Sequence, residues 1–364
     1  MKTKIKVLFI LPSLKAGGAE RVVSYLAQSL NKDKFESSLL VIGSESDIAY
    51  EVKDVSLIIL NKKRVLHAFV PILKIIKRSR PDIVFSSIGH LNAMMGIQSI
   101  FFSNIRFIGR ETNVLSVLKN YTGKKNKKSF GGGIISKIGH HYLHKLVCQS
   151  EDMANDLVNE YNFSREKLCV INNPIPMSLQ RKKEIVPVGT AGFKLITVGR
   201  LKKQKGHLRI LEALAKLRFP YQYTMIGDGP EKEVIFERAK GLGVFEHLVH
   251  IEFTDKVFEY LAESHLFLQG SYVEGFPNAL LESCAVGTPV LAFNAPGGID
   301  EIIEEGVNGY IVDSIEDYSE KIEAILKTMD SWVPDVVSDS VFRKYSTAQI
   351  LGRYEELFIE SAQN

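Results

Sequence analysis

Glu274-Gly-Phe-Pro-Asn-Ala-Leu-Leu-Glu282 is a stretch in which a loop gives way to a helix. Pro277 cannot lie inside a helix, but it fits the first helical turn because its missing N–H is not needed there. We therefore expect a helix that begins near Asn278 and leaves Glu274 in the preceding loop. The N–H groups of a first helical turn attract anions. The stretch predicts an anion site between two carboxylates; an ordinary loop with a solvated glutamate is the alternative.

Strands and helices alternate on both sides of this stretch. Short apolar runs at 194–198, 221–226 and 266–269 are each followed by a loop and then a helical pattern. The first half repeats the alternation, beginning with a buried strand at 4–11 and a helix at 19–30. Such alternation predicts an α/β fold with parallel, doubly wound sheets, which bind ligands at the carboxyl ends of their strands.

The length of the chain predicts two domains, because 364 residues exceed the usual size of a single core. We expect an N-terminal Rossmann-like domain over residues 1–175 and a C-terminal Rossmann-like domain over residues 193–341. The polar run 176–192 is expected to link them. The last helix, about 342–362, is expected to pack back on the first domain.

Cysteine usage and hydropathy bear on the compartment. Cys148, Cys169 and Cys284 are far apart in the sequence, which argues for a reducing compartment and against a disulfide framework or a zinc site. The N-terminal apolar run is too short for a signal peptide and breaks at Pro12. No stretch approaches the roughly 18 apolar residues of a membrane span. These features predict a cytoplasmic protein.

Charge is distributed unevenly along the chain. Residues 1–180 carry 26 Lys and Arg against 14 Asp and Glu, whereas the remainder carries 20 against 28. The segment 112–150 contains no acidic residue, and its lysines are interleaved with aromatic and aliphatic residues, of which Ile134, Ile135, Ile138 and Tyr142 share a helical face. We expect the basic segment 119–145 to meet an anionic membrane surface. A mobile loop followed by a core helix is the alternative, and the lack of a recognition motif argues against nucleic acid.

Several loops have the composition of phosphate-binding loops. Gly17 and Gly18 lie between a strand and a helix, which is a phosphate-cradling arrangement, although no G-x-G-x-x-G dinucleotide motif occurs. Arg200 and Lys205 flank the loop after the first strand of the second half. A sugar nucleotide, with hydroxyls beside a diphosphate, would suit such loops together with Glu274. A plain turn or a solvated basic loop is the alternative reading of each.

Polar residues also follow two predicted strands of the first half. They are His90, Asn92, Arg110, Glu111 and Asn113. Because carboxyl ends of parallel strands share one edge of a sheet, all five are candidate cleft residues, with capping or surface roles as the alternative.

Taken together, these motifs resemble the family 4 retaining glycosyltransferases of the GT-B fold over nearly the whole chain. The matching residues are Gly17-Gly-Ala-Glu20, Gly199-Arg200 with Lys205-Gly206, Gly227-Asp-Gly-Pro230, the opening stretch, and Gly287-Thr-Pro-Val290 with Gly297-Gly298 and Glu301. The resemblance implies two Rossmann-like domains facing across a cleft, and a hexosyltransferase that uses a nucleotide-diphosphate sugar.

The resemblance also implies roles for single residues. Arg200 and Lys205 would hold the diphosphate, and Glu274 would bind hydroxyls of the transferred sugar; these three are the expected catalytic residues. Glu282 would bind the ribose. Nucleotide-sugar contacts are expected from Gly17, Gly18, Glu111, Gly227, Asp228, Gly275, Phe276, Pro277, Asn278, Ala279 and Glu282. His90 and Asn113 are the acceptor or cleft candidates.

The family's chemistry sets further expectations. No Asp-x-Asp occurs in the sequence, so we expect metal-independent transfer with no cofactor besides the sugar nucleotide. Retention is usually assigned to front-side attack, in which the departing phosphate accepts the acceptor's proton and no side-chain nucleophile is needed. Many members have histidine where this chain has Glu111. That glutamate could accept a hydrogen bond from a sugar hydroxyl, or it could give the enzyme a different donor preference. His90 could supply an imidazole.

The basic segment 119–145 falls where membrane-associated members of the family dock to reach lipid-linked acceptors. We therefore expect a peripheral enzyme at the inner face of the cell membrane. It would extend a glycan linked to polyprenyl diphosphate, such as undecaprenyl diphosphate, for capsule, O-antigen or a related polymer.

Other classes of protein share this fold. A sugar-nucleotide epimerase lacks the Glu-x7-Glu pattern, and a phosphorylase is much longer. A hinged sugar-binding protein is usually exported. A non-catalytic partner subunit is the remaining alternative, although the retention of Arg200, Lys205, Glu274 and Glu282 argues against decay.

Overall fold

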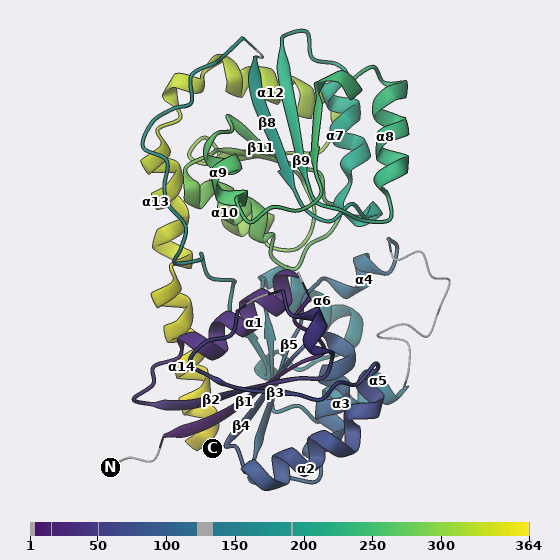
Figure 1. Cartoon of the computed structure of the whole chain (residues 1–364), viewed down its shortest axis with the longest axis vertical. Helices are drawn as coiled ribbons and strands as arrows, with labels where there is room; N and C mark the ends of the chain where they lie inside the picture. Colours follow the sequence, from purple (N-terminus) through teal and green to yellow (C-terminus); the bar gives the residue numbers. More distant parts are fainter. Residues whose placement is uncertain (1–3, 16, 50, 122–133, 191, 364) are drawn as a thin grey trace. The chain divides into compact units, whose positions relative to one another are not determined.

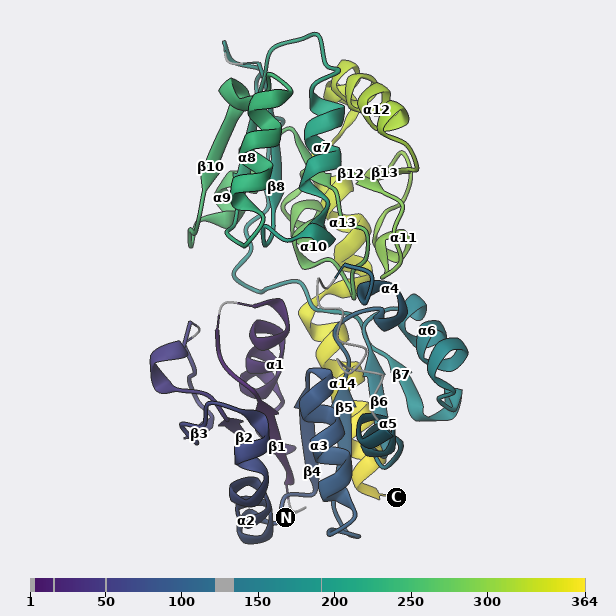
Figure 2. The ribbon, with the colours of Figure 1, turned by 90° about the vertical axis from the view of Figure 1, so that its right-hand side faces the viewer.

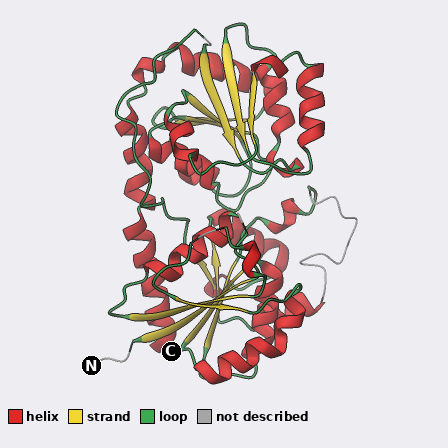
Figure 3. Ribbon diagram, in the orientation of Figure 1, coloured by secondary structure: helices red, strands yellow, loops and turns green. Residues whose placement is uncertain are grey.

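The computed structural model describes residues 4–15, 17–49, 51–121, 134–190 and 192–363. The chain forms two compact units, each built from a sheet and surrounding helices (Figures 1 and 3). Unit 1 combines Met1–Leu115, Gly123–Pro174 and Ala348–Asn364. Unit 2 combines Ser116–Thr122 and Ile175–Thr347.

Unit 1 contains a parallel sheet in which seven described strands lie in the order β3-β2-β1-β4-β5-β6-β7. The strands are β1 (Ile5–Leu11), β2 (Phe35–Val41), β3 (Ser56–Ile59), β4 (Ile83–Ser87), β5 (Arg106–Arg110), β6 (Lys145–Cys148) and β7 (Leu168–Val170). The helices are α1 (Gly18–Ser29), α2 (Phe69–Ser79), α3 (Gly89–Ser99), α4 (Leu115–Leu118), α5 (Ile134–His141), α6 (Glu151–Tyr161) and α14 (Thr347–Gln363). A short 3₁₀ helix, η2 (Val65–Ala68), precedes α2.

The C-terminal helix α14 completes the core of unit 1. The ring of Phe358 packs edge-on against Phe9 and Phe85, with centroids 6.0 Å and 5.6 Å away. Tyr354, one turn earlier, packs against Phe85 at 5.8 Å. These rings are fully buried, so α14 covers apolar strand residues that would otherwise face water.

Unit 2 contains a parallel sheet with the strand order β10-β9-β8-β11-β12-β13 among its described residues. The strands are β8 (Phe193–Val198), β9 (Tyr221–Ile226), β10 (Leu248–Ile251), β11 (Leu266–Gln269), β12 (Val290–Phe293) and β13 (Gly309–Val312). The helices are α7 (His207–Leu214), α8 (Lys232–Gly241), α9 (Val257–Ala262), α10 (Asn278–Val286), α11 (Ile299–Ile302), α12 (Ile315–Lys327) and α13 (Pro334–Tyr345), and η4 (Lys203–Lys205) precedes α7. The predicted α/β class with two doubly wound parallel sheets is confirmed.

Each sheet has a point at which the strand order reverses. In unit 1 the reversal lies between β1 and β4, and in unit 2 it lies between β8 and β11. Loops that leave these neighbouring strands at their carboxyl ends diverge and open a crevice, which is where doubly wound sheets bind ligands.

The chain enters the main body of unit 2 and leaves it at adjacent residues. The N–H of Ile175 donates to the carbonyl of Tyr345 at 2.9 Å. The Thr347 hydroxyl donates to the carbonyl of Ile175 at 2.6 Å. These bonds join the first and last residues of the segment 175–347.

Candidate functional site

The predicted phosphate and sugar residues of unit 2 follow the two strands at its switch point. Arg200 and Lys205 lie in the segment after β8, and Glu274 lies in the loop after β11. The two strands are parallel neighbours, so both segments leave the same edge of the sheet. This topology brings together side chains that are 69 residues apart in the sequence.

Lys205 and Glu274 are in direct contact. Nζ of Lys205 lies 2.6 Å from Oε1 of Glu274. The same carboxylate oxygen accepts hydrogen bonds from the Ser271 hydroxyl at 2.5 Å and from Nε2 of Gln269 at 2.9 Å. Glu274 is buried, whereas the Lys205 side chain is 28% exposed. Three donors thus fix the carboxylate through Oε1, and within the described residues none of them reaches Oε2.

The lysine loop is held against the glutamate loop by its backbone. Gly206 has a φ of +61°, and a Cβ on it would lie 1.7 Å from the carbonyl oxygen of Gly270. The N–H of Tyr272 donates to the carbonyl of Gln204 at 2.9 Å. Nε2 of Gln204 returns a bond to the carbonyl of Val273 at 2.9 Å. Only glycine provides both the left-handed conformation and the close approach at position 206.

The loop after β12 supports Glu274 from another side. The N–H of Glu274 donates to the carbonyl of Pro296 at 2.9 Å. Gly297 has a φ of +120°, and a Cβ on it would lie 2.3 Å from the carbonyl oxygen of Glu274. The sequence motif Gly297-Gly298 is therefore part of the support for this carboxylate.

Helix α10 begins where the sequence predicts. Pro277 caps it in an extended conformation, and the first intrahelical bond runs from the N–H of Leu281 to the carbonyl of Pro277 at 3.0 Å. The amides of the first turn therefore point out of the end of the helix. Gly275, Phe276 and Pro277 are buried, and Asn278 and Ala279 are half-buried. Glu282 lies in the following turn of α10 and is buried, with an exposure of 5%.

The remaining predicted residues of unit 2 lie at the same edge of the sheet. Gly227 and Asp228 directly follow β9, and the carbonyl of Asp228 accepts a bond from the N–H of Leu201 at 3.0 Å. The side chains of Arg200 and Asp228 are exposed. The structure therefore places Arg200, Lys205, Asp228 and Glu274 on loops at one edge.

Two residues of α7 that the sequence arguments missed also organise this region. Nε of Arg209 donates to the carbonyl of Gly270 at 2.7 Å, and Nη2 donates to the carbonyl of Ser271. The guanidinium lies over the rings of Tyr272 and Phe293, at 4.1 Å and 4.0 Å. Arg209 follows the glycine turn at the start of a helix, a pattern from which contact with a neighbouring loop could have been inferred.

His207 is the second of these residues. Burial lowers its pKa to about 4, so the imidazole is neutral near pH 7. Nε2 lies 3.3 Å from the carbonyl oxygen of Arg200. His207 thus contacts the backbone of the arginine loop without adding a charge to it.

Tyr121 of unit 2 contacts the loop after β11, which also holds Glu274. The ring of Tyr121 stacks on that of Tyr272, with centroids 4.8 Å apart and planes 10° from parallel. Tyr121 belongs to the basic segment 119–145. The lysines of that segment at positions 124, 125, 127 and 128 lie outside the described residues.

Unit 1 holds the predicted Glu111 in a buried network. Oε1 of Glu111 accepts a bond from Nδ2 of Asn92 at 3.0 Å, and Nε2 of His140 lies 3.2 Å from the same oxygen. Oδ1 of Asn92 in turn accepts a bond from the Ser86 hydroxyl at 2.8 Å. The imidazole beside Glu111 therefore comes from His140 of α5, a histidine that we expected only as part of the basic segment.

The other candidates of unit 1 have varied environments. His90 is exposed at the start of α3, and Asn113 is half-buried after β5. Gly17 is extended, with a φ of −154°, and caps α1, whose first residue is Gly18. Arg110 is fully buried and donates from Nη2 to Oδ1 of Asn173 at 2.5 Å. Arg110 is therefore buried in the interior of unit 1, as Asn92 and Glu111 are, and is not open to solvent as we expected of a cleft residue.

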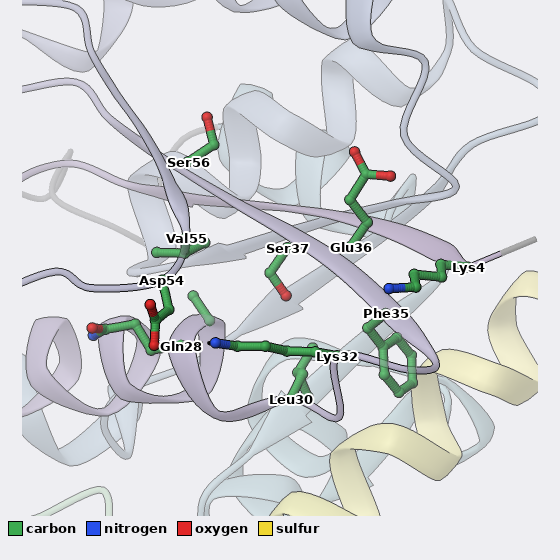
Figure 4. Close-up of a pocket in the computed structure, with 11 residues that line it drawn as sticks. Lys4, Gln28, Leu30, Lys32, Phe35, Glu36, Ser37, Asp54, Val55 and Ser56 are labelled. Atoms are coloured by element: carbon green, nitrogen blue, oxygen red, sulfur yellow. Dashed lines mark ion pairs between the residues drawn. The ribbon is translucent and has the colours of Figure 1, made fainter.

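A hollow of about 370 Å³ lies at the opposite edge of the unit 1 sheet (Figure 4). It is lined by residues near the amino ends of strands, including Lys4, Phe35 and Ser56, and by the ion pair of Lys32 with Asp54 at 3.1 Å. None of the predicted site residues lines it, so it is separate from the candidate site.

No helix within the described ranges is long and apolar enough to cross a membrane. This finding agrees with the lack of a long apolar stretch in the sequence.

Comparison with solved structures identifies the fold. The chain superposes on an apo form of the lipopolysaccharide outer core galactosyltransferase WaaB with a TM-score of 0.77 and 17% identity, over 98% of this chain and 99% of that one. It superposes on HepE of Anabaena in complex with UDP-glucose with a TM-score of 0.78 and 16% identity, over 98% and 100% of the two chains.

Sequence comparison identifies relatives of nearly the same length. An N-acetylgalactosamine-N,N'-diacetylbacillosaminyl-diphospho-undecaprenol 4-alpha-N-acetylgalactosaminyltransferase of Campylobacter jejuni is 25% identical over 321 residues, covering 85% of this chain and 86% of the relative. The amylovoran biosynthesis glycosyltransferase AmsD of Erwinia amylovora is 25% identical over 318 residues, with 85% and 86% coverage.

Two family models match consecutive parts of the chain. Residues 16–179 match the model described as Glycosyltransferase Family 4, and residues 180–331 match the model described as Glycosyl transferases group 1. Together they cover the unit 2 sheet, the unit 1 sheet except β1, and the predicted site residues. The chain belongs to the GT-B glycosyltransferases that these two models describe.

Proposed function

We propose that this glycosyltransferase moves a hexosyl group from a nucleotide-diphosphate sugar to a lipid-linked glycan, with retention of configuration and without a metal ion. The observation that carries the proposal is the contact of Lys205 with Glu274, on loops that follow the two strands at the switch point of unit 2. This contact pairs a cation suited to phosphate with a carboxylate suited to sugar hydroxyls. Lys205 and Glu274 both lie at the edge of the sheet where the strands end, and α10 begins at the same edge.

In the proposed reaction the bond between the sugar C1 and the diphosphate oxygen breaks. The acceptor hydroxyl oxygen forms the new bond to C1 on the same face, and its proton passes to the departing diphosphate. Arg200, Lys205 and the backbone amides from Phe276 to Ala279 stabilise the charge that develops on the diphosphate. Glu274 accepts hydrogen bonds from sugar hydroxyls through Oε2, and Glu282 accepts hydrogen bonds from the hydroxyls of the ribose.

The proposal gives the other predicted residues secondary contacts. Gly17 and Gly18 approach the phosphates with their backbone, and Gly227 with Asp228 positions the Arg200 loop. Glu111, which is in contact with His140, contacts the transferred sugar. His90 and Asn113 contact the acceptor.

The names of relatives support a lipid-linked acceptor in the synthesis of a surface polysaccharide. The Campylobacter jejuni relative is named for a diphospho-undecaprenol substrate, and the Erwinia amylovora relative for amylovoran synthesis. We propose that the enzyme works at the inner face of the cell membrane and contacts anionic lipid through the basic segment 119–145.

The test is incubation with a panel of nucleotide sugars and a polyprenyl-diphosphate-linked acceptor in the presence of EDTA. We expect nucleotide diphosphate release that depends on one sugar, and a product whose anomeric configuration, measured by NMR, matches the donor. Release that requires a divalent metal would contradict the metal-independent mechanism. Epimerised sugar without transfer would indicate an epimerase, and tight donor binding without release would indicate a non-catalytic partner.

A further inference from the structure

Five planar side chains of unit 2 form a continuous stack beside the loop after β11. In order along the stack they are Tyr121, Tyr272, Arg209, Phe293 and Tyr318. The ring centroids of Tyr121 and Tyr272 lie 4.8 Å apart. The guanidinium carbon of Arg209 lies 4.1 Å from the ring centroid of Tyr272 and 4.0 Å from that of Phe293. The ring centroids of Phe293 and Tyr318 lie 4.2 Å apart. We call this arrangement the planar stack.

Steric exclusion fixes the order of the planar stack. Two planar groups that both lie over one ring must occupy its opposite faces, because each excludes the other from its own face. Arg209 covers one face of Tyr272, and Tyr121 lies within 10° of parallel to that ring and so covers the other face. Tyr272 is therefore clamped between a cation and a second aromatic ring, both of which attract its faces.

The inner end of the planar stack belongs to the core of unit 2. Phe293 and Tyr318 are buried, and the Tyr318 hydroxyl donates to the carbonyl of Leu291 at 2.9 Å. Tyr318 lies in α12 and Arg209 in α7, and these helices are side by side (Figure 2). The outer members, Tyr121 and Tyr272, are only half-buried. A fixed inner end thus supports the rings beside the loop.

Arg209 also holds the backbone of this loop. Its Nε donates to the carbonyl of Gly270 at 2.7 Å, and its Nη2 donates to the carbonyl of Ser271. The hydroxyl of Ser271 in turn donates to Oε1 of Glu274 at 2.5 Å. Only the planar fork of arginine can bind two carbonyls while it lies flat between two rings. Arg209 is therefore connected to the Glu274 carboxylate through Ser271.

We propose that Arg209 and Tyr121 are positioning residues for the sugar donor. They clamp Tyr272 from opposite faces and so hold Glu274, two residues further along, in the place where it meets the transferred sugar. Neither residue touches the donor, and both act through the loop after β11. Because this loop is ordered in advance, less of the donor's binding free energy is lost in ordering it. The proposal rests on the proposed function, from which it takes the role of Glu274.

The test compares Tyr121→Ala with Tyr121→Phe in the steady-state release of nucleotide diphosphate. Tyr121→Ala removes the outer ring and should raise KM for the donor about two- to tenfold, which is the contribution of one aromatic pair. Its kcat should stay within about twofold of wild type, because the loop is equally ordered once the donor is bound. Tyr121→Phe keeps the ring and should restore the wild-type KM. Arg209→Lys, which keeps the charge but loses the fork, should raise KM at least as much as Tyr121→Ala.

Two further variants separate positioning from a general effect. In a Tyr272→Ala background, Tyr121→Ala should cause no additional rise in KM, because Tyr121 acts only through the ring of Tyr272. Tyr310→Ala is the matched control. Tyr310 is a half-buried tyrosine of β13 that also contacts a cation and a ring, with Lys321 Nζ 4.2 Å from its centroid and the Trp332 ring at 5.8 Å. Its loss should leave KM unchanged.

Hydrogen exchange tests the clamp without donor or turnover. The N–H of Tyr272 donates to the carbonyl of Gln204, and the N–H of Glu274 donates to the carbonyl of Pro296, each at 2.9 Å. Both amides should exchange about two- to tenfold faster in Tyr121→Ala than in wild type, because the loop opens more often. Tyr310→Ala should leave both rates unchanged. Urea titration checks that each variant is folded, and the Tyr121 variants decide the outcome if Arg209→Lys is not.

Three outcomes would overturn the proposal. One is a wild-type KM in Tyr121→Ala, whether or not exchange is faster, since the planar stack would then be structural only. Another is a raised KM that Tyr121→Phe does not restore. The third is an equal rise in Tyr310→Ala. Calorimetric titration of the donor separates the two proposals: wild type that binds the donor, loses affinity in Tyr121→Ala and transfers no sugar would support the positioning role and contradict the proposed function.

Discussion

Nζ of Lys205 lies 2.6 Å from Oε1 of Glu274 at the switch point of the second sheet. The lysine is the more exposed of the two, at 28% against 7% for the glutamate side chain. The ammonium group of Lys205 can therefore contact a diphosphate as well as Glu274, while Ser271 and Gln269 keep the glutamate in place. In the proposed reaction the pair connects the site for the leaving group with the site for the sugar.

Replacement of Lys205 by alanine should reduce turnover while the protein remains folded. We expect kcat/KM to fall by about 10²–10³, the effect of removing one fixed charge or donor from a developing anion. Steady-state release of nucleotide diphosphate measures this. Lys203→Ala is the matched control, because Lys203 lies exposed in the same 3₁₀ turn. Equal losses in the two variants would contradict a specific role for Lys205.

Replacement of Glu111 by alanine should destabilise unit 1. The variant leaves the Asn92 amide and His140 without their shared acceptor in the interior. We expect a loss of about 1–3 kcal/mol in the free energy of unfolding, measured with urea. Glu151→Ala, which removes an exposed carboxylate paired with Arg165 at 2.9 Å, should cost less than about 1 kcal/mol.

A double-mutant cycle isolates the Glu111 contact. Glu111→Ala and His140→Ala should be non-additive by about 0.5–3 kcal/mol, as expected for residues in contact. Additive effects would show that the two side chains do not stabilise each other in solution.

Lys182 should make stability rise with alkaline pH. Burial lowers its pKa to about 8 from 10.5, and Nζ donates to Thr288 Oγ1 at 2.9 Å and to the Ser264 carbonyl at 3.2 Å. The folded state then binds fewer protons at this site than the unfolded state between those two pKa values, so deprotonation favours folding there.

Comparison with Lys182→Met isolates this effect from other titrating groups. Wild type should gain free energy of unfolding relative to the variant as the pH rises from 8 to 10.5. Urea titrations at several pH values measure the difference. A constant difference across that window would mean that the Lys182 pKa is the same in both states.

Tyr345 should tune donor affinity through the loops that it contacts. Its hydroxyl donates to the carbonyl of Glu301 at 2.6 Å, and its ring packs edge-on against Phe276 with centroids 5.2 Å apart. Tyr345→Phe removes only the hydroxyl. It should raise KM for the sugar nucleotide with little change in kcat, because the same loops contact the sugar nucleotide in the bound ground state and in the transition state. Tyr345→Leu, which also removes the ring contact, should raise KM further.

Tyr221→Phe is the control for Tyr345→Phe. It removes a buried tyrosine hydroxyl that donates to the carbonyl of Leu214 at 3.2 Å. Tyr221 is the first residue of β9 and so lies at the opposite edge of the sheet from the candidate site. Both variants should lose about 0.5–1.5 kcal/mol of stability. Only Tyr345→Phe should change KM, and a similar rise in Tyr221→Phe would make the effect one of stability alone.

The sheets could be predicted from sequence because buried parallel strands and amphipathic helices have distinct periodicities. Strands β9 and β11 have the predicted bounds, and α10 begins at Asn278, where Pro277 allows a helix to start. The rule that ligands bind at carboxyl ends of strands then groups Arg200, Lys205 and Glu274 without any contact information.

Side-chain partners could not be predicted in the same way. The environment of Glu111 depends on how α5 packs on α3, and that packing rests on the fit of Gly96 against Gly139 rather than on a pattern within either helix. The burial of Arg110 depends on which face of the sheet it points to and on α14, far along the chain, covering it. Nothing in the local sequence indicates that Lys205 pairs with Glu274.

The hydrogen bonds that join Ile175 to Tyr345 and Thr347 make the body of unit 2 an insert with adjoining ends. Two junctions within a few residues of each other would suffice to excise the segment 175–347 or to exchange it with the same segment of a relative. Such chimeras would carry the loops with Arg200, Lys205 and Glu274, which we propose bind the donor, from one enzyme on the unit 1 of another. Evolution of donor and acceptor preference could therefore proceed by recombination at a single locus of the fold as well as by point substitution.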